Sequence, residues 1–285
     1  MNKKTITVHT LVRNEDRFIY FAIMSVINYV DKIIIYDTGS TDDTVKIIKH
    51  IIASGYENKI LFEEKGVSDR NKIGLLRQEM IEKTDTDYFM ILDGDEIWWK
   101  KTIEELISII NEESHEKYLV AQHYINCSKD IFHYRNPGRD VFSFLDKKEA
   151  STIRLYSMKI PGIHCGGYYG IEGFFDKDNE EVQSGKYEIF WQKEKYFHTS
   201  YIQRSSKQYA DLKVYSRINK LFPAYDYKFA RDFAYPEVFY SNYPDFIRNP
   251  FKKDFFSIRS VIYFMLDTIK IRKLINLFRK NKFRK

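Results

Sequence analysis

The sequence is poor in cysteine, with Cys127 and Cys165 as its two thiols and no CxxC pair. Two thiols without that spacing argue against a disulfide scaffold and against a zinc knuckle, and they suit a reducing compartment. A hydrophobic content of 44% is enough for a substantial core. The length of 285 residues predicts one large domain, or one domain with an appendage.

Long apolar runs are also missing. No stretch of about 18 uninterrupted apolar residues is present, so a membrane-spanning helix is not expected. No apolar signal segment precedes the first predicted strand, which begins near Ile6. We therefore expect a cytoplasmic protein.

Excess positive charge is absent from most of the chain. Residues 251–285 hold eleven Lys or Arg and two Asp, a net charge of +9, so the first 250 residues carry −3 of the total of +6. A mildly acidic body disfavours nucleic acid as a partner. The tail, 254–285, interleaves apolar and basic residues. It fits an interfacial helix on an anionic membrane, at the inner face of the cell membrane, or a helix that packs on the body.

The first hundred residues alternate apolar runs with segments of helical periodicity. The predicted strands are 6–12, 32–36, 59–63 and 88–92, and the predicted helices are 17–29, 41–54 and 72–83. In the second helix Ser40 or Thr41 is the expected N-cap. The order βαβαβαβ predicts an α/β fold with a mostly parallel, right-handed, doubly wound sheet flanked by helices.

The second half of the chain is less regular. Thr102 and Glu105 have the spacing of a capping box that would open a helix to about residue 113. The other expected segments are strands at 118–125 and 151–156, a polar loop at 127–150 and a glycine-rich loop at 162–173. The segment 195–201, which holds His198, follows, and then a helical stretch from 203.

One short segment carries the clearest chemical signal. The apolar run 88–92 leads directly into Asp93, Gly94, Asp95 and Glu96. Ligands of open α/β sheets bind at the carboxyl ends of strands, and Asp37 ends a neighbouring predicted strand at the same edge. Converging carboxylates favour a hard divalent cation between them. The alternative is a solvated acidic turn.

Three motifs together resemble a family 2 glycosyltransferase of the GT-A fold. They are residues 11–15 (LVRNE), 35–44 (IYDTGSTDDT) and 87–96 (DYFMILDGDE). The resemblance extends over about residues 5–200 and weakens after 115. It implies a hexosyltransferase that uses a nucleotide-sugar donor, with UDP as the expected nucleotide, Mn²⁺ or Mg²⁺ as cofactor, and a glycan or lipid-linked acceptor.

The resemblance also implies roles for individual residues. Asp37 would bind the uracil or ribose, Arg77 would hold the base although Gln78 replaces the family's Asn, and Asp93 would contact the ribose or sugar. Asp95 and His198 would ligate the metal, and the imidazole favours Mn²⁺. The complete expected donor-binding set is Val12, Asn14, Glu15, Asp37, Arg77, Asp93 and Gly94.

The general base is less well marked. Relatives carry a V-H-E pattern after an R-L-[FY] strand, and here Glu172 follows Arg154-Leu-Tyr156 without the histidine. Glu172 is the expected base, with Asp140 and Asp176 as rivals. A nucleophilic role for Cys165 beside His164 is disfavoured because no third orienting group is evident.

The expected organisation is a GT-A domain over 1–215, with a nucleotide-binding half at 1–100 and an acceptor half at 101–215. A helical aromatic-rich extension at 216–253 and the basic tail 254–285 follow. Two other functions remain open. A sugar-phosphate nucleotidyltransferase would want a glycine-rich loop after the first strand, which residues 13–16 lack. A non-catalytic carbohydrate- or lipid-binding module would have no need to retain the acidic residues and His198.

Overall fold

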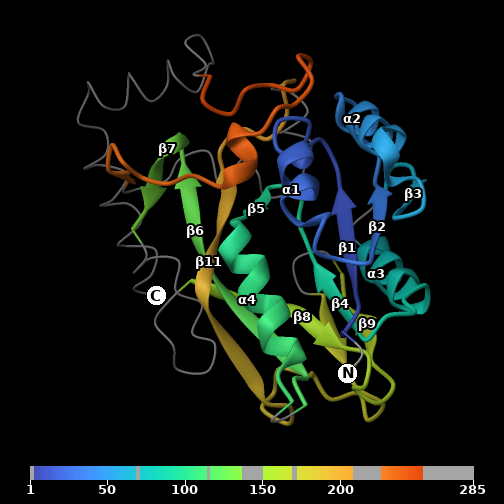
Figure 1. Ribbon diagram of the computed structural model, residues 1–285. Coiled ribbons are helices and arrows are strands. Elements are labelled where there is room, and N and C mark those ends of the chain that lie inside the picture. The colour runs from blue at the N-terminus through green and yellow to red at the C-terminus, as the bar shows by residue number, and fades with distance from the viewer. Residues whose placement is uncertain are drawn as a thin grey trace, which may run out of the picture.

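The computed structural model describes residues 3–68, 71–113, 116–136, 150–168, 172–207 and 226–252 (Figure 1). Strands and helices alternate through the first part of the chain. The elements are β1 (Ile6–Val12), α1 (Ile19–Val26), β2 (Lys32–Asp37), α2 (Thr44–Ile51), a π-helical segment (Ile52–Tyr56), β3 (Ile60–Glu64), α3 (Lys72–Glu82), β4 (Tyr88–Ile91), β5 (Glu96–Trp98) and α4 (Lys100–Asn111).

Strands dominate the remainder of the described chain. The elements are β6 (Leu119–Ser128), β7 (Asp130–Arg135), β8 (Ser151–Ser157), β9 (His164–Gly166), β10 (Gly173–Phe175), β11 (Ile189–Tyr201), β12 (Asp226–Lys228) and a 3₁₀-helix (Glu237–Tyr240). None of the helices in this described part is long and apolar enough to cross a bilayer.

A single mixed sheet runs through both parts of the chain, with β9 and β10 forming a separate hairpin. Its strand order is β12-β7-β6-β8-β4-β1-β2-β3, and β11 lies beside β6 and carries β5 on its other edge. The strands β3, β2, β1 and β4 are parallel neighbours, as predicted. The expectation of a mostly parallel sheet is wrong beyond β4, because β8 is antiparallel to both β4 and β6.

Helices cover the two faces of the sheet. On one face α1 packs against α2 and α4, and Figure 1 shows α1 and α4 in front of the sheet. On the other face α3 contacts the β9–β10 hairpin and closes a second core around Phe89 and Tyr156. Strands buried on both faces need apolar side chains at successive positions, which explains the unbroken runs in β2 and β4.

The pairing of β5 with β11 is the feature that the sequence did not reveal. These antiparallel strands set His198 opposite Glu96 and Tyr196 opposite Trp98. The Trp98 ring stacks on the Tyr196 ring, with centroids 5.5 Å apart and planes inclined by 4°. Strand β11 begins 93 residues after the first residue of β5, so a distant part of the chain returns to the acidic turn.

Both predicted helix caps are wrong. Helix α2 begins at Thr44, and its backbone N–H donates to Asp42 Oδ1 at 3.0 Å, whereas Ser40 and Thr41 lie in the preceding loop. Helix α4 begins at Lys100, which places Thr102 and Glu105 inside it. Thr102 Oγ1 donates instead to the Lys195 carbonyl at 2.6 Å, which fixes α4 against β11.

Four other expectations need correction or fall on residues outside the described part. The expected loop 127–150 contains the strand β7. Residues 203–207 are not helical, and the described residues 226–252 hold β12 and one short 3₁₀-helix rather than a helical extension. Residues 208–225 and the basic tail 254–285 lie outside the described residues.

Replacing Trp98 by alanine tests the β5–β11 packing. The Trp98 side chain is 1% exposed, so Trp98→Ala should lower the free energy of unfolding by about 3–5 kcal/mol. Leu75→Ala, at a side chain that is 71% exposed, is the control and should change it by less than about 0.5 kcal/mol. Denaturant titration measures both. Equal effects at the two positions would contradict the described packing.

Candidate functional site

The acidic turn lies between β4 and β5, at the carboxyl edge of the parallel strands. Gly94 is required there by close packing, not by a left-handed backbone. A Cβ at Gly94 would lie 2.9 Å from Glu15 Cγ and 3.3 Å from Ile19 Cδ1. The β1–α1 loop and the acidic turn are therefore in direct contact at Gly94.

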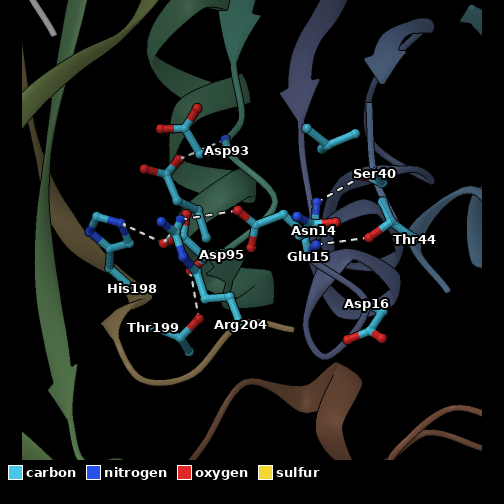
Figure 2. Close-up of polar contacts among 12 residues, drawn as sticks. Asn14, Glu15, Asp16, Ser40, Thr44, Asp93, Asp95, His198, Thr199 and Arg204 are labelled. Carbon is cyan, nitrogen blue, oxygen red and sulfur yellow. Dashed lines mark hydrogen bonds and ion pairs between the residues drawn. The ribbon is translucent and has the colours of Figure 1, made fainter. Parts of the chain in front are cut away.

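The register of β11 brings His198 to Asp95. The backbone N–H of Thr199 donates to the Asp95 carbonyl at 2.8 Å, which holds the two strands together beyond β5. His198 Nε2 then lies 3.4 Å from Asp95 Oδ2 (Figure 2). The structure thus brings together the two residues expected to ligate a metal, although His198 follows Asp95 by 103 positions along the chain.

Arg204 is a site residue that the sequence reasoning missed. Its Nη1 donates to Asp95 Oδ2 at 2.5 Å and lies 3.1 Å from Glu15 Oε1, and Figure 2 shows the guanidinium between the two carboxylates. The residue is 8% exposed. Residues 202–205 form neither helix nor strand, so hydrophobic periodicity gave no reason to place Arg204 at the site.

The loop after β1 is held in a specific conformation by Asn14. Its φ of +57° is in the left-handed region, where asparagine is tolerated better than most residues. The Asn14 backbone N–H donates to Ser40 Oγ at 2.8 Å, and its Oδ1 accepts from the Thr41 N–H at 2.7 Å. The Val12 carbonyl accepts two hydrogen bonds from Thr38. Val12 and Asn14 therefore position the β1 and β2 loops relative to each other.

Asp37 ends β2 beside that loop and is 3% exposed. Its Oδ1 accepts from the backbone N–H groups of Gly39 at 3.0 Å and Ser40 at 2.9 Å. Its Oδ2 is buried and has no hydrogen-bond partner in the structure. A buried carboxylate oxygen without a donor is costly, so the position favours a ligand that supplies an N–H or O–H group.

Asp93 faces two arginines. Arg154 Nη2 donates to its Oδ2 at 3.2 Å, and Arg77 Nη2 lies 3.5 Å from its Oδ1. Burial acts to raise the pKa of Asp93, but the charges of Arg154 and Arg77 outweigh it and hold that pKa below its ordinary value. Asp93 therefore carries negative charge at neutral pH. Through this contact Arg77, a residue singled out in the sequence, lies at the acidic turn.

Glu96 is enclosed, with 0% exposure, and its carboxylate accepts a hydrogen bond from Arg154. Burial raises the pKa of Glu96 to about 8. Its Oε2 also accepts from the Asp93 backbone N–H at 3.3 Å, so Glu96 braces the turn from within. These contacts make Glu96 a support for Asp93 and Arg154.

The candidate bases differ in their surroundings. Asp176 is fully buried, accepts from two backbone N–H groups and the Tyr187 hydroxyl, and Lys186 holds its pKa well below the ordinary value. These bonds give Asp176 a structural role in the turn that follows β10. Glu172 directly precedes β10 and is half-buried, and its charge acts on the Cys165 thiol together with that of Arg77. Asp140 lies outside the described residues.

Asp95 and His198 are the described residues that could hold a divalent cation. They place one carboxylate oxygen and one imidazole nitrogen 3.4 Å apart, although Arg204 already donates to the same carboxylate oxygen. No group of three His, Cys, Asp or Glu side chains suited to a metal occurs among the described residues. The remaining ligands would have to come from the substrate or from water.

A cavity of about 510 Å³ lies beside His198, between β6, β7, β11 and the segment after β12. Tyr124 lines it, and the Tyr124 ring meets the His198 ring edge-on with centroids 5.3 Å apart. Its lining includes three basic residues, Arg135, Lys195 and Lys228, and the aromatic residue Phe233.

The fold and site define an α/β protein with acidic side chains and a histidine gathered at the carboxyl edge of parallel strands. Residues 7–171 match the family model described as glycosyl transferase family 2. An uncharacterised glycosyltransferase of Rickettsia typhi is 28% identical over 159 residues, which cover 55% of this chain and 47% of the relative. The chain belongs to glycosyl transferase family 2, and its match spans about half the length of that relative.

Several solved structures are similar to part of this chain. The S. aureus TarS fragment 1–349 has a TM-score of 0.42 at 12% identity and covers 76% of this chain and 68% of its own. A Pyrobaculum calidifontis mannosyltransferase in complex with GDP-Man and Mn²⁺ has a TM-score of 0.35 at 14% identity, covering 46% and 37%. Glucosyl-3-phosphoglycerate synthase from Mycobacterium tuberculosis, with Mg²⁺ and UDP, has 0.33 at 28% identity, covering 42% and 44%. These scores are low, so the family assignment rests on the sequence match.

The two thiols are expected to be unreactive in the folded protein. Burial raises the pKa of Cys165 to about 11 and that of Cys127 well above its ordinary value. Since the thiolate is the nucleophile, iodoacetamide at pH 8 should label the native protein far more slowly than the unfolded chain. Labelling of Cys165, followed in Cys127→Ser, should accelerate as the pH rises towards 11. Rapid labelling at pH 7 would contradict the described burial.

Proposed function

We propose that this protein transfers a sugar from a nucleotide diphosphate, with UDP as the expected nucleotide, to a hydroxyl group with inversion. The observation that carries the proposal is the 3.4 Å approach of His198 Nε2 to Asp95 Oδ2, at the edge where Asp37 ends β2 and Asp93 follows β4. Family membership supports the same reaction class.

Asp37 is the proposed contact to the base. Its buried Oδ2 requires a donor, and uracil offers one ring N–H next to two carbonyl groups. Asn14 contributes indirectly, because its bonds to Ser40 and Thr41 hold the loop that also bonds Asp37 Oδ1. A base bound here would lie beside β2, with the ribose directed towards Asp93.

The diphosphate end of the donor belongs next to Asp95 and His198. A divalent cation bound there would neutralise charge on the departing diphosphate. Asp95 supplies an anionic oxygen, His198 a neutral nitrogen, and the β5–β11 register keeps both in place. Mn²⁺ is the expected metal because the set contains an imidazole, with Mg²⁺ as the alternative.

The acceptor is proposed to bind on the side of the donor where Glu172 lies, next to Cys165 and Arg77. Glu172 is the proposed general base, and in-line displacement requires it within about 3 Å of the attacking hydroxyl. A glycan or lipid-linked acceptor is the expected class. Attachment of residues 254–285 to an anionic membrane surface stays a prediction, because these residues lie outside the described part of the chain.

Asp95→Asn tests donor binding. In the parent, UDP with Mn²⁺ should raise the melting temperature well beyond the effect of either alone, because a ligand that binds only the folded state stabilises it. Asp95→Asn weakens the metal ligand and should abolish this synergy. Each variant is compared with its own unliganded melting temperature, since the substitution also removes the charge that pairs with Arg204.

The matched control is Asp245→Asn, which removes one exposed carboxylate and should keep the synergy. Equal stabilisation of the parent by UDP in the presence of EDTA would contradict the metal-dependent site. Absence of any UDP effect in the parent would contradict the proposed function and favour a non-catalytic module.

Glu172→Gln tests the base. The substitution keeps size and hydrogen bonding but removes proton acceptance, so sugar transfer should fall by roughly 10²–10⁴-fold while UDP and Mn²⁺ bind as in the parent. Transfer to water or to an acceptor panel, followed by UDP release, measures the rate. Glu57→Gln, at an exposed position, is the control. Normal transfer by Glu172→Gln with loss of transfer in Asp140→Asn or Asp176→Asn would identify the base as one of those residues.

A further inference from the structure

Arg204 is a buried cation in the place where the proposed reaction concentrates negative charge. Its Nη1 contacts Asp95 Oδ2 at 2.5 Å and Glu15 Oε1 at 3.1 Å, so the guanidinium bridges the acidic turn and the β1–α1 loop. The oxygen that it contacts is the same one that lies 3.4 Å from His198 Nε2. A divalent cation and Arg204 would thus compete for one carboxylate oxygen.

The backbone around Arg204 is fixed to the loops that would surround the donor. The Arg204 carbonyl accepts from the Arg17 N–H at 3.1 Å. Ser205 Oγ donates to Asp42 Oδ2 at 2.6 Å, and the Ser206 N–H donates to Asp16 Oδ1 at 2.7 Å. These bonds hold the backbone at Arg204 and directly after it, so an exchange of partners would have to come from the Arg204 side chain.

The chemistry of the guanidinium suits a diphosphate. Arginine offers five N–H donors in a planar fork, and such forks bind phosphate oxygens with strong, charge-assisted hydrogen bonds. A cation that took Asp95 would also repel the guanidinium, whereas the two negative charges of a bound diphosphate would attract it. Glu15 would remain as the second partner in either arrangement.

We propose that Arg204 is a diphosphate-binding residue that exchanges partners: it neutralises Asp95 in the free protein and donates to a diphosphate oxygen of the bound nucleotide. This inference rests on the proposed function, because it assumes a nucleotide diphosphate beside Asp95. The inference goes beyond the proposed function because it assigns Arg204 two alternating partners. Arg204 then opposes metal binding in the absence of nucleotide and supports nucleotide binding in the presence of metal.

These two effects have opposite signs, which makes the proposal testable by binding alone. Arg204→Gln removes the cation that competes for Asp95. Asp95 is then free to bind metal in every molecule, so Mn²⁺ alone should bind more tightly, by about threefold or more. The same variant loses charge-assisted bonds to the diphosphate, so UDP in saturating Mn²⁺ should bind at least about tenfold more weakly.

The measurements use the full chain, with free Mn²⁺ followed by electron paramagnetic resonance and UDP binding by titration calorimetry. Lys207→Gln is the matched control. It removes one positive charge from the same segment, at a side chain whose Nζ donates to the Thr41 carbonyl, and should leave both affinities within about twofold of the parent. Circular dichroism confirms that each variant is folded.

Arg204→Lys keeps the test decisive if Arg204→Gln fails to fold. Lysine retains the charge but lacks the fork, so Mn²⁺ alone should bind as in the parent while UDP binds more weakly. Unchanged UDP affinity in Arg204→Gln or Arg204→Lys overturns the proposal, and so does a parallel loss of Mn²⁺ and UDP binding, which indicates a purely structural bridge. Failure of the parent itself to bind UDP with Mn²⁺ contradicts the proposed function instead.

Discussion

The antiparallel pairing of β5 with β11 is the constraint on which the site depends. Without it, the turn after β4 would present carboxylates to solvent, with no histidine beside them. The pairing sets His198 opposite Glu96 and lets the Thr199 N–H bond the Asp95 carbonyl. The chain then turns at Ile202 and delivers Arg204 to the same carboxylate. The parallel strands β2, β1 and β4 form the edge that holds the acidic residues, and the antiparallel strand β11 adds His198.

The site is also a balance of charge. Four acidic side chains, Glu15, Asp93, Asp95 and Glu96, lie close together, and three buried or half-buried arginines, Arg77, Arg154 and Arg204, contact them. Burying carboxylates is costly unless they are paired, so the acidic turn depends on arginines from α3, β8 and the segment after β11. A bound metal and a diphosphate would add charge of both signs to a cluster already close to neutral.

Local patterns allowed much of the fold and part of the site to be predicted. The parallel strands and their helices follow from runs of apolar residues and from periodicity, which depend on neighbours in the chain. Asp37, Asp93 and Asp95 were found because they end such strands. Strand β7 was missed because the stretch 127–150 is largely polar, and the expected capping box was wrong because Thr102 and Glu105 bond β11 instead of their own helix.

The site contacts that the sequence did not predict join segments that are far apart in the chain. Arg204 lies in a stretch that the sequence predicts to be helical, and its two partners lie 109 and 189 positions earlier in the chain. Arg154 was noted as part of a strand motif, but its contact with Glu96 depends on β8 pairing beside β4. Asn14 is expected to bind the donor, and its backbone N–H and its Oδ1 also bond Ser40 and Thr41, which the sequence did not indicate. Such roles depend on register, which a single sequence does not display.

The register between β5 and β11 also determines where the chain tolerates a change of length. Side chains alternate between the two faces of a strand, so one residue inserted between Tyr196 and His198 would turn the histidine away from Asp95. An extra residue in the turn between β6 and β7 would leave that register untouched. In this chain the β6–β7 turn should therefore tolerate an inserted residue, while the segments 95–98 and 196–199 should not.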